Sequence, residues 1–458
     1  MKRRNLFLGT ISGITLGVIE SLSSKNLLSS TRPNIVIILA DDMRWDALGA
    51  MGNRIIRTPN LDRLAYEGVL FLNNFVTTSI CPTSRASIFT GQYGRRHQIW
   101  DFETPFTPQQ FQQTYPALLR AAGYRTAFIG KWGLGGDLPS LEFDYWQGFA
   151  GQGQYFEKNR KKHLTKLLTE QAIEFIQTCS SRQPFCLSLS YKAPHAQDSD
   201  RGSFQSETDL ASLYQDVTIP KPPTATEEHF NRLPNFLKQS SGRTRWYNRF
   251  SDDKIFQHSV KQYYRLITGL DRGVGDIIRV LTEQNLLENT CIIFTSDNGF
   301  LLGDRGLSDK WFGYEESIRT PLIIRPAQRA IQQIIPSITL NIDLAPTIVE
   351  LAGLDRPSSM QGLSLMSLWR GESQQLRDKF FYEHLLQSSK IPKSEGFRTE
   401  NSKYLRYLIG NSPYEMLFDL ETDPLEERNL AQLEEYQNKL AEVRQIFLEI
   451  KQTIAQSS

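Results

Sequence analysis

The 458-residue sequence is poor in cysteine and histidine and has no excess of either charge. It contains four Cys and six His, and 52 Lys and Arg against 50 Asp and Glu leave a formal net charge of +2. Because so even a balance creates no strong field of one sign, we expect neither nucleic acid nor a stable membrane association as a partner. Internal repeats and low-complexity tracts are also lacking. A composition of 40% hydrophobic and 22% charged residues is typical of an ordinary globular protein. A length of 458 residues is enough for one large α/β domain and a smaller one.

The N-terminal 30 residues have the pattern of a signal peptide. Lys2-Arg3-Arg4 precedes a mildly apolar stretch that runs from Leu6 to Ile19 and is too short and too polar for a membrane span. Arg3-Arg4 followed by Asn5-Leu6-Phe7-Leu8 resembles a twin-arginine signal, which would suit export of a folded protein. We therefore expect a periplasmic or extracellular location, with a disordered basic tail as the alternative.

Strand and helix patterns alternate through the middle of the chain. Ile35–Leu39 is a continuous β-branched and aliphatic run, the pattern of a strand buried on both faces of a parallel sheet. The alternation predicts an α/β fold with a mostly parallel sheet flanked by helices over residues 31–371. Residues 372–458 are expected to form a C-terminal α+β subdomain with a small antiparallel sheet and a final helix at 433–454. The other expected strands are 126–129, 185–190, 290–296, 322–324, 380–383, 404–409 and 416–419, and the expected helices are 115–122, 164–178, 261–284 and 344–351; residues 198–253 are expected to be long loops.

Polar residues follow several of these strands directly. Asp41-Asp42, Lys131, His195 and Asp297-Asn298 each come just after a predicted strand. In a parallel sheet the carboxyl ends of the strands meet at one edge, where ligands bind, so these side chains are expected to lie together. Asp41, Asp42, Asp297 and Asn298 offer only oxygen ligands, which favours a hard divalent ion over zinc.

The stretch from Ser79 to Gly91 combines a cysteine with a helix start. Pro82 suits the first turn of a helix, and Cys81 would lie at the N-terminus, where the helix dipole favours negative charge. Arg85, one turn later, can reach back toward the same point. The pattern indicates an anion bound beside an activated or modified sulfur.

This stretch resembles the signature of the type I sulfatases, usually Cys-x-Pro-Ser-Arg followed by Thr-Gly; here Thr83 stands where Pro is usual. Other parts of the chain, from about residue 32 to residue 429, resemble further motifs of that family in the same order. They are Asn34–Asp42, Gly130-Lys131-Trp132, Ala193-Pro194-His195, Thr295–Gly299, Asp309-Lys310, Tyr314–Arg319 and Asp343–Thr347.

The resemblance implies a fold of the alkaline phosphatase superfamily and hydrolysis of sulfate esters. In the family, a formylglycine-generating enzyme oxidises the residue matching Cys81 to formylglycine, whose hydrated aldehyde attacks sulfur and then expels sulfate as the carbonyl re-forms. The implied cofactor is Ca²⁺, with Mg²⁺ in some relatives, on the four oxygen ligands. The implied sulfate contacts are Arg85, Lys131, His195 and Lys310. The expected substrate is a sulfated small molecule or a sulfated carbohydrate.

The sequence departs from the family at Gly133, where a His is frequent. The role of that His is either missing or taken by another group, such as His97, whose simpler interpretation is structural. If it is missing, Gly133→His is expected to raise turnover. The alternative is that Gly133 has a positive φ or makes room for a bulky substrate, and then any side chain at this position lowers turnover. Arg305 is either a substrate contact or a surface residue. Pairing of Cys179 with Cys186 stays open, and Cys186 and Cys291 suit core positions.

Two other functions compete with a sulfatase. One is a phosphonate monoester hydrolase or phosphodiesterase of the same superfamily, which uses the same modified cysteine. The other is a catalytically inactive protein that binds sulfated glycans.

Overall fold

The computed structural model describes residues 32–157, 162–197, 204–328 and 332–456. The expected signal peptide and its twin-arginine pattern therefore lie outside the described residues. Within the described ranges no helix has both the length and the apolar character needed to cross a membrane.

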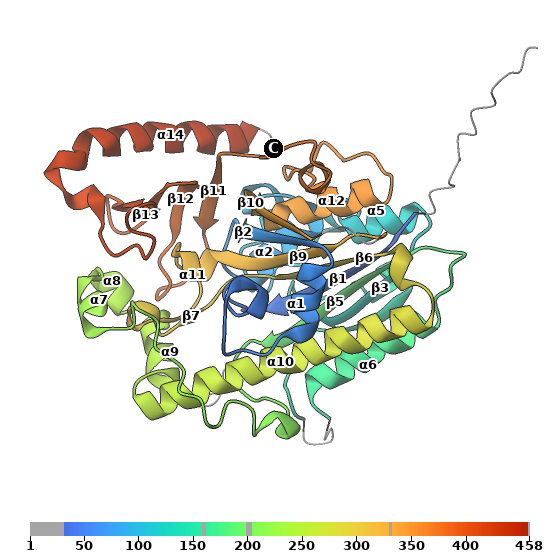
Figure 1. Ribbon diagram of the computed structural model, residues 1–458. Helices are drawn as coiled ribbons and strands as arrows, with labels where there is room; N and C mark the ends of the chain where they lie inside the picture. Colours follow the sequence, from blue (N-terminus) through green and yellow to red (C-terminus); the bar gives the residue numbers. More distant parts are fainter. Residues whose placement is uncertain (1–31, 158–161, 198–203, 329–331, 457–458) are drawn as a thin grey trace, which may run out of the picture. The chain divides into compact units, whose positions relative to one another are not determined.

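A mostly parallel sheet forms the centre of the described chain, as predicted (Figure 1). Its eight strands run in the order β10-β2-β9-β6-β1-β5-β3-β4. Only β9 is antiparallel to its neighbours within this sheet. The bounds are β1 Asn34–Asp41, β2 Val69–Phe75, β3 Arg125–Lys131, β4 Tyr145–Phe149, β5 Phe185–Pro194, β6 Thr290–Ser296, β9 Arg319–Arg325 and β10 Gln333–Leu340.

Successive residues of β1 pack on opposite faces of the sheet. Val36 and Ile38 belong to the hydrophobic cluster that includes α6 and α10, whereas Ile35 and Ile37 belong to the cluster of α2, α5 and α12. All eight residues of β1 are buried, which explains the unbroken apolar run in the sequence. Helices cover both faces in Figure 1. They are α1 Pro59–Tyr66, α6 Leu164–Gln177 and α10 Asp253–Glu283 on one face, and α2 Cys81–Thr90, α5 Tyr115–Ala121 and α12 Leu344–Leu351 on the other.

The C-terminal part forms a second, antiparallel sheet in the order β11-β12-β13-β14, with the helix α14 packed against it (Figure 1). Phe447 of α14 stacks on Phe381 of β11 with ring centroids 5.9 Å apart. This agrees with the predicted kind of structure, and the boundary at residue 371 stays a prediction. The bounds are β11 Lys379–His384, β12 Ser394–Thr399, β13 Ser402–Tyr407, β14 Tyr414–Asp419 and α14 Gln437–Gln456.

Several elements differ from the sequence predictions. The described part of the stretch expected to be loops contains the helices α7 Glu227–Arg232, α8 Asn235–Lys238 and α9 Ser241–Arg249. These helices have few buried residues, so their apolar periodicity is weak. The long helix begins at Asp253 rather than 261, because Asp252 caps it by accepting a hydrogen bond from Ile255 N at 2.9 Å. The strands β2, β4, β10 and β12 were not predicted.

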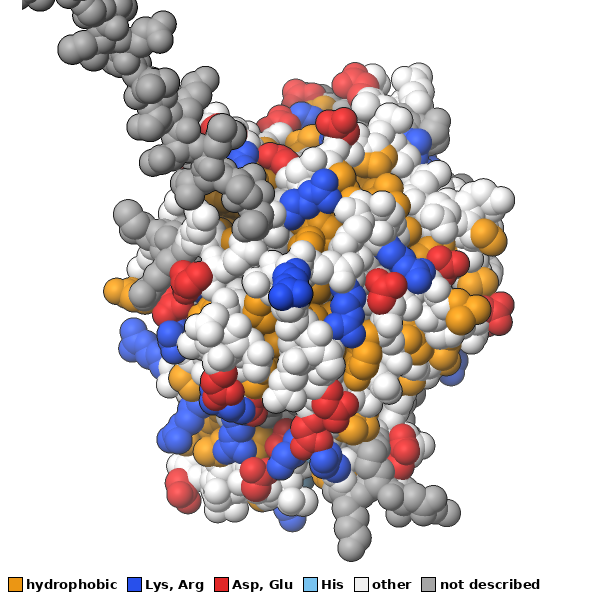
Figure 2. All heavy atoms as spheres, turned by 90° about the vertical axis from the view of Figure 1, so that its right-hand side faces the viewer, with side chains coloured by type: hydrophobic (Ala, Val, Ile, Leu, Met, Phe, Trp, Pro, Cys, Tyr) orange, Lys and Arg blue, Asp and Glu red, His pale blue; other side chains and the backbone are white. Residues whose placement is uncertain are grey.

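The surface mixes charges of both signs. On the face in Figure 2, Lys and Arg side chains alternate with Asp and Glu, and apolar side chains are scattered among them. On this face, positive and negative side chains are therefore mixed, in agreement with the even charge balance of the whole sequence.

Candidate active site

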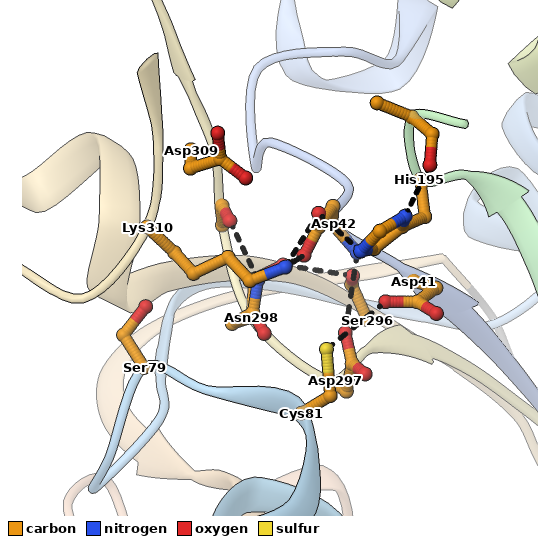
Figure 3. Close-up of polar contacts among 12 residues, drawn as sticks. Asp41, Asp42, Ser79, Cys81, His195, Ser296, Asp297, Asn298, Asp309 and Lys310 are labelled. Atoms are coloured by element: carbon orange, nitrogen blue, oxygen red, sulfur yellow. Dashed lines mark hydrogen bonds and ion pairs between the residues drawn. The ribbon is translucent and has the colours of Figure 1, made fainter. Parts of the chain in front are cut away.

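Cys81 lies at the start of α2, directly below the end of β1. The sequence places Pro82 in the first turn and ends the helix at Gly91, whose φ of 66° suits a residue without Cβ. All ten residues of α2 are buried. The Cys81 Sγ donates to Asp41 Oδ1 at 3.3 Å (Figure 3). The predicted helix start therefore brings the sulfur to the edge of the sheet where the strands end.

The acidic residues after β1 and β6 meet beside Cys81, as their positions after parallel strands predicted. Asp42 N donates to Asp297 Oδ1 at 3.2 Å, and Asn298 Nδ2 donates to Asp42 Oδ1 at 2.7 Å (Figure 3). Asp41, Asp42 and Asp297 are fully buried. Ligand atoms of Asp41, Asp42, Cys81 and His195 all lie within 4.8 Å of one another.

Four cationic or basic side chains surround these carboxylates. Lys131 Nζ lies 2.5 Å from Asp41 Oδ2, and Lys310 Nζ lies 2.6 Å from Asp42 Oδ1. Arg85 Nε donates to Asp297 Oδ2 at 2.9 Å. The fourth is His195, whose Nε2 is 3.5 Å from Asp42 Oδ2. The structure thus brings every predicted site residue into one cluster.

The donor set fits a hard divalent cation. Three carboxylates converge with one amide, and Asn298 Oδ1 is buried with no hydrogen-bond partner among the described residues. An unsatisfied buried acceptor is costly unless a cation or donor meets it. Burial and the neighbouring carboxylates raise the pKa of Asp42 to about 7, although Lys310 opposes the shift. Bound positive charge would relieve this repulsion.

The thiol of Cys81 is held in its neutral form. Burial and the charge of Asp41 raise the pKa of Cys81 well above its usual value. Since the thiolate is the reactive form of cysteine, the unmodified side chain is a weak nucleophile in this environment.

Lys310 lies in an unusual backbone segment that the sequence did not reveal. Asp309 and Trp311, on either side of it, have φ of 72° and 81°. The Asp309 carboxylate accepts from Arg245 Nη1 at 2.8 Å and also from Arg249, both on α9. The unpredicted helix α9 therefore fastens the residue that precedes Lys310. In the sequence, only the spacing of Arg245 and Arg249, four residues apart, could have indicated a helix that points two arginines to the same side.

A side chain at position 133 would require its neighbours to move. Its φ is 78°, and a Cβ there would lie 2.8 Å from Arg85 Cδ. Both observations favour the alternative in which Gly133 is needed for its positive φ, and they argue against a gain in turnover from Gly133→His. His97 is committed to structural bonds, since its Nδ1 accepts from Ile99 N at 3.1 Å and its Nε2 lies 3.1 Å from Ser87 Oγ.

The structure also shows the surroundings of Arg305, Cys179 and Cys186. Arg305 is buried and pairs with both oxygens of Glu316 at 3.0 Å, so it is not a surface residue. No disulfide joins Cys179 and Cys186, which are both free thiols.

A buried cysteine beside three carboxylates and four basic groups, at the strand ends of an α/β sheet, fits the class of hydrolases that act on anionic esters. The comparison with protein families identifies which one: the chain belongs to the sulfatase family, whose model matches residues 33–354. It is a sulfuric ester hydrolase with an alkaline phosphatase-like fold. A second family model, described as "N-sulphoglucosamine sulphohydrolase, C-terminal", matches residues 303–453.

Individual relatives agree with this assignment. The N-acetylglucosamine-6-O-sulfatase of Bacteroides thetaiotaomicron is 29% identical over 91% of this chain and 86% of its own length. A solved structure in complex with its substrate D-glucosamine-2-N,6-O-disulfate has a TM-score of 0.79 and 27% identity, covering 92% of this chain and 98% of the other. The phosphonate monoester hydrolase of Silicibacter pomeroyi shares the fold (TM-score 0.78, 22% identity, 92% and 95% coverage).

Proposed function

We propose that this chain hydrolyses sulfate monoesters through a formylglycine made from Cys81, with a divalent metal ion held by Asp41, Asp42, Asp297 and Asn298. The observation that supports it most is the position of Cys81 Sγ, buried and 3.3 Å from Asp41 Oδ1. Calcium is the preferred ion, since all four ligands are oxygens, and magnesium is the alternative. A formylglycine-generating enzyme is the implied partner in maturation.

Different residues of the site would have different roles in the reaction. A hydrated aldehyde at position 81 supplies two hydroxyl groups, one to attack sulfur and one whose proton is lost when sulfate leaves. The bound metal ion would lower the pKa of the attacking hydroxyl and polarise a sulfate oxygen. Lys131, which pairs with Asp41, and Lys310, which pairs with Asp42, would bind the sulfate oxygens as charge builds up on them.

His195 is suited to hold or move a proton near the ester oxygen. Its Nδ1 lies 2.6 Å from Ala196 O, which fits a proton on Nδ1 and leaves Nε2 facing the cluster. Burial, with Lys310 nearby, keeps the pKa of His195 well below its usual value. Arg85 would act mainly by orienting Asp297 and the Lys131 backbone, whose carbonyl accepts from Arg85 Nη1 at 2.7 Å.

The substrate class we propose is a sulfated carbohydrate, with glucosamine 6-sulfates first. It is supported by the two relatives whose names contain sulfated glucosamines and by the second family match over the C-terminal part. Each of those names describes the relative and supplies the starting point for assays of this chain.

Parallel assays test the proposal. The purified, metal-loaded protein is given 4-nitrophenyl sulfate, N-acetylglucosamine 6-sulfate, bis(4-nitrophenyl) phosphate and an aryl phosphonate, and the peptide containing Cys81 is weighed by mass spectrometry. We expect aldehyde at position 81 and a preference for the sulfate esters. A preference for the phosphorus esters would instead support the phosphonate hydrolase alternative. Aldehyde without any turnover would support the sulfated-glycan binder.

A further inference from the structure

A chain of polar contacts leads from Cys81 outward and ends at Gln152. Cys81 Sγ donates to Asp41 at 3.3 Å, and the other oxygen of Asp41 is 2.5 Å from Lys131 Nζ. The same ammonium donates to Gln152 Oε1 at 2.7 Å. Cys81, Asp41 and Lys131 are fully buried, whereas Gln152 is only partly buried. Gln152 is therefore the point where this chain of contacts reaches the surface.

The loop that carries Gln152 is built to place it there. The parallel pairing of β3 and β4 sets Phe149 opposite Lys131, so the loop after β4 leaves the sheet at the same edge as Lys131. Gly151 and Gly153 flank Gln152 with φ of 67° and 64°, a conformation that favours glycine. A Cβ at Gly153 would also lie 2.6 Å from Phe149 Cε2. The two glycines let the chain turn back over the end of β3.

The contacts of Lys131 leave one direction for a ligand. An ammonium group has three N–H donors, and the described residues that accept from it are Asp41 on the buried side and Gln152 on the outer side. A carboxamide is also bifunctional: while Oε1 accepts from Lys131, the two N–H donors of Nε2 remain next to it. An anion that meets the third donor of Lys131 lies beside those amide donors.

We propose that Gln152 binds the sulfate group of the substrate through its Nε2 donors, with its Oε1 anchored on Lys131. This role of Gln152 rests on the proposed function in one respect, that the bound anion is sulfate. Gln152 then determines specificity as a neutral donor at the outer edge of the sulfate site. Its ligand is an oxyanion that accepts from an ammonium and an amide at once.

Three variants separate this role from one that only holds Lys131 in place. Gln152→Met keeps the size but removes both functions, and Gln152→Glu keeps an acceptor for Lys131 but replaces the amide donors by negative charge. Gln147→Met is the control, since Gln147 lies in β4, just before the loop that carries Gln152, is exposed, and contacts Gln171 instead of Lys131. Because Gln152 is partly exposed, none of these changes should disturb folding, which thermal unfolding checks.

The first readout is the dissociation constant for inorganic sulfate by calorimetry, which needs neither turnover nor oxidation of Cys81. The second is kcat/KM on 4-nitrophenyl sulfate. We expect Gln152→Met to weaken both by about tenfold to a hundredfold, the value of a hydrogen bond to a charged group. Gln152→Glu should be weaker still, by at least about tenfold, because its carboxylate repels sulfate. Gln147→Met should match the wild type.

Two results would overturn the assignment. If Gln152→Glu binds sulfate better than Gln152→Met, the residue serves only as an acceptor for Lys131. If Gln152→Met binds sulfate as the wild type does, the amide contributes no contact. Absence of turnover in the wild type, together with sulfate binding that depends on Gln152, would instead reject the proposed function and keep the sulfate contact.

Discussion

The two halves of the site hold their charged side chains by different means. In one half, Asp41, Lys131 and Asp297 lie at the ends of central parallel strands, whose neighbours on both sides fix their backbone. In the other half, Lys310 follows the two-residue strand β8 Ser308–Asp309, in a segment with left-handed residues on both sides. There, among the described strands, β8 pairs only with the equally short β7 Leu301–Leu302, and ion pairs from α9 to Asp309 add to that small sheet.

This difference has a physical consequence. A strand inside a sheet is positioned by many backbone hydrogen bonds, so losing one side chain leaves the others in place. The segment around β8 has few backbone hydrogen bonds to the described residues, those of its pairing with β7 and one from Trp311 N to Ser79 O at 3.1 Å, so it depends more on the Asp309 carboxylate. Left-handed backbone at non-glycine residues also carries a cost in free energy that the surroundings must offset. Substitutions in the strand-end half should therefore change chemistry first, and those around β8 should change stability and chemistry together.

The largest effect is expected from Cys81→Ala in the strand-end half. Loss of the proposed nucleophile should lower kcat by about 10⁴-fold or more, with the fold retained because little volume changes. Turnover of sulfate esters measures it, and Cys291→Ala, an equally buried thiol in β6, is the control that should stay active. Near wild-type turnover by Cys81→Ala would falsify the nucleophile assignment.

Asp297→Ala is expected to come next. Removing one of the proposed oxygen ligands should reduce bound metal and lower kcat/KM by at least about 10²-fold. Metal content after dialysis and activity are measured on the same sample. Asp271→Asn is the control, because this carboxylate of α10 accepts from Leu61 N at 2.8 Å, away from the site, and should not affect the metal. A full metal complement in Asp297→Ala removes Asp297 from the ligand set.

Asp309→Ala tests the β8 half. Arg245 and Arg249 would lose the carboxylate that accepts from both, so the free energy of unfolding should fall by about 1–3 kcal/mol. In addition, kcat/KM should fall by about tenfold or more, because Lys310 loses its fixed backbone. Chemical denaturation and steady-state kinetics report the two effects.

Asp309→Asn provides the matched control for that change. Asparagine keeps the shape, accepts one hydrogen bond and adopts left-handed backbone readily, so it should recover part of both losses. If Asp309→Ala loses activity while its free energy of unfolding is unchanged, the segment around β8 does not depend on Asp309 for its stability, and the proposed difference between the two halves is wrong.

The smallest effect is expected from Gly133→Ala, which adds one methyl group beside Arg85. The positive φ alone should lower the free energy of unfolding by about 1–2 kcal/mol. The added Cβ, 2.8 Å from Arg85 Cδ, should lower it further. Gly123→Ala isolates the first contribution, since Gly123 has φ of 89° and no atom within 4 Å of an added Cβ. The difference between their unfolding free energies measures the contact. A more active Gly133→Ala would show that the site has room for a side chain there.

Much of the fold was available in the sequence because its signals are local. Continuous apolar runs predicted the strands β1, β5 and β6. The bounds of β6 and α12 agree with the prediction to the residue. By contrast, β2 carries two asparagines and β10 a proline, so their patterns are weaker. The short helices α7, α8 and α9 were missed because most of their surface faces solvent, which removes the apolar periodicity that marks a helix.

The sequence by itself also determined which residues gather at the site. Polar residues directly after parallel strands must meet at one edge, so Asp41, Asp42, Lys131 and Asp297 were predictable from strand order alone. The start of α2 was likewise predictable from Pro82, and its end from Gly91.

Only the tertiary structure decided how those residues pair and what surrounds them. That Lys131 pairs with Asp41 and Gln152, and Lys310 with Asp42, depends on side chains from segments that are distant in sequence. The same holds for Gly133, whose need for glycine comes from Arg85 of α2 and a positive φ. Periodicity describes which face of an element is buried, whereas these contacts depend on the packing of separate elements, for which a single sequence carries no local signal.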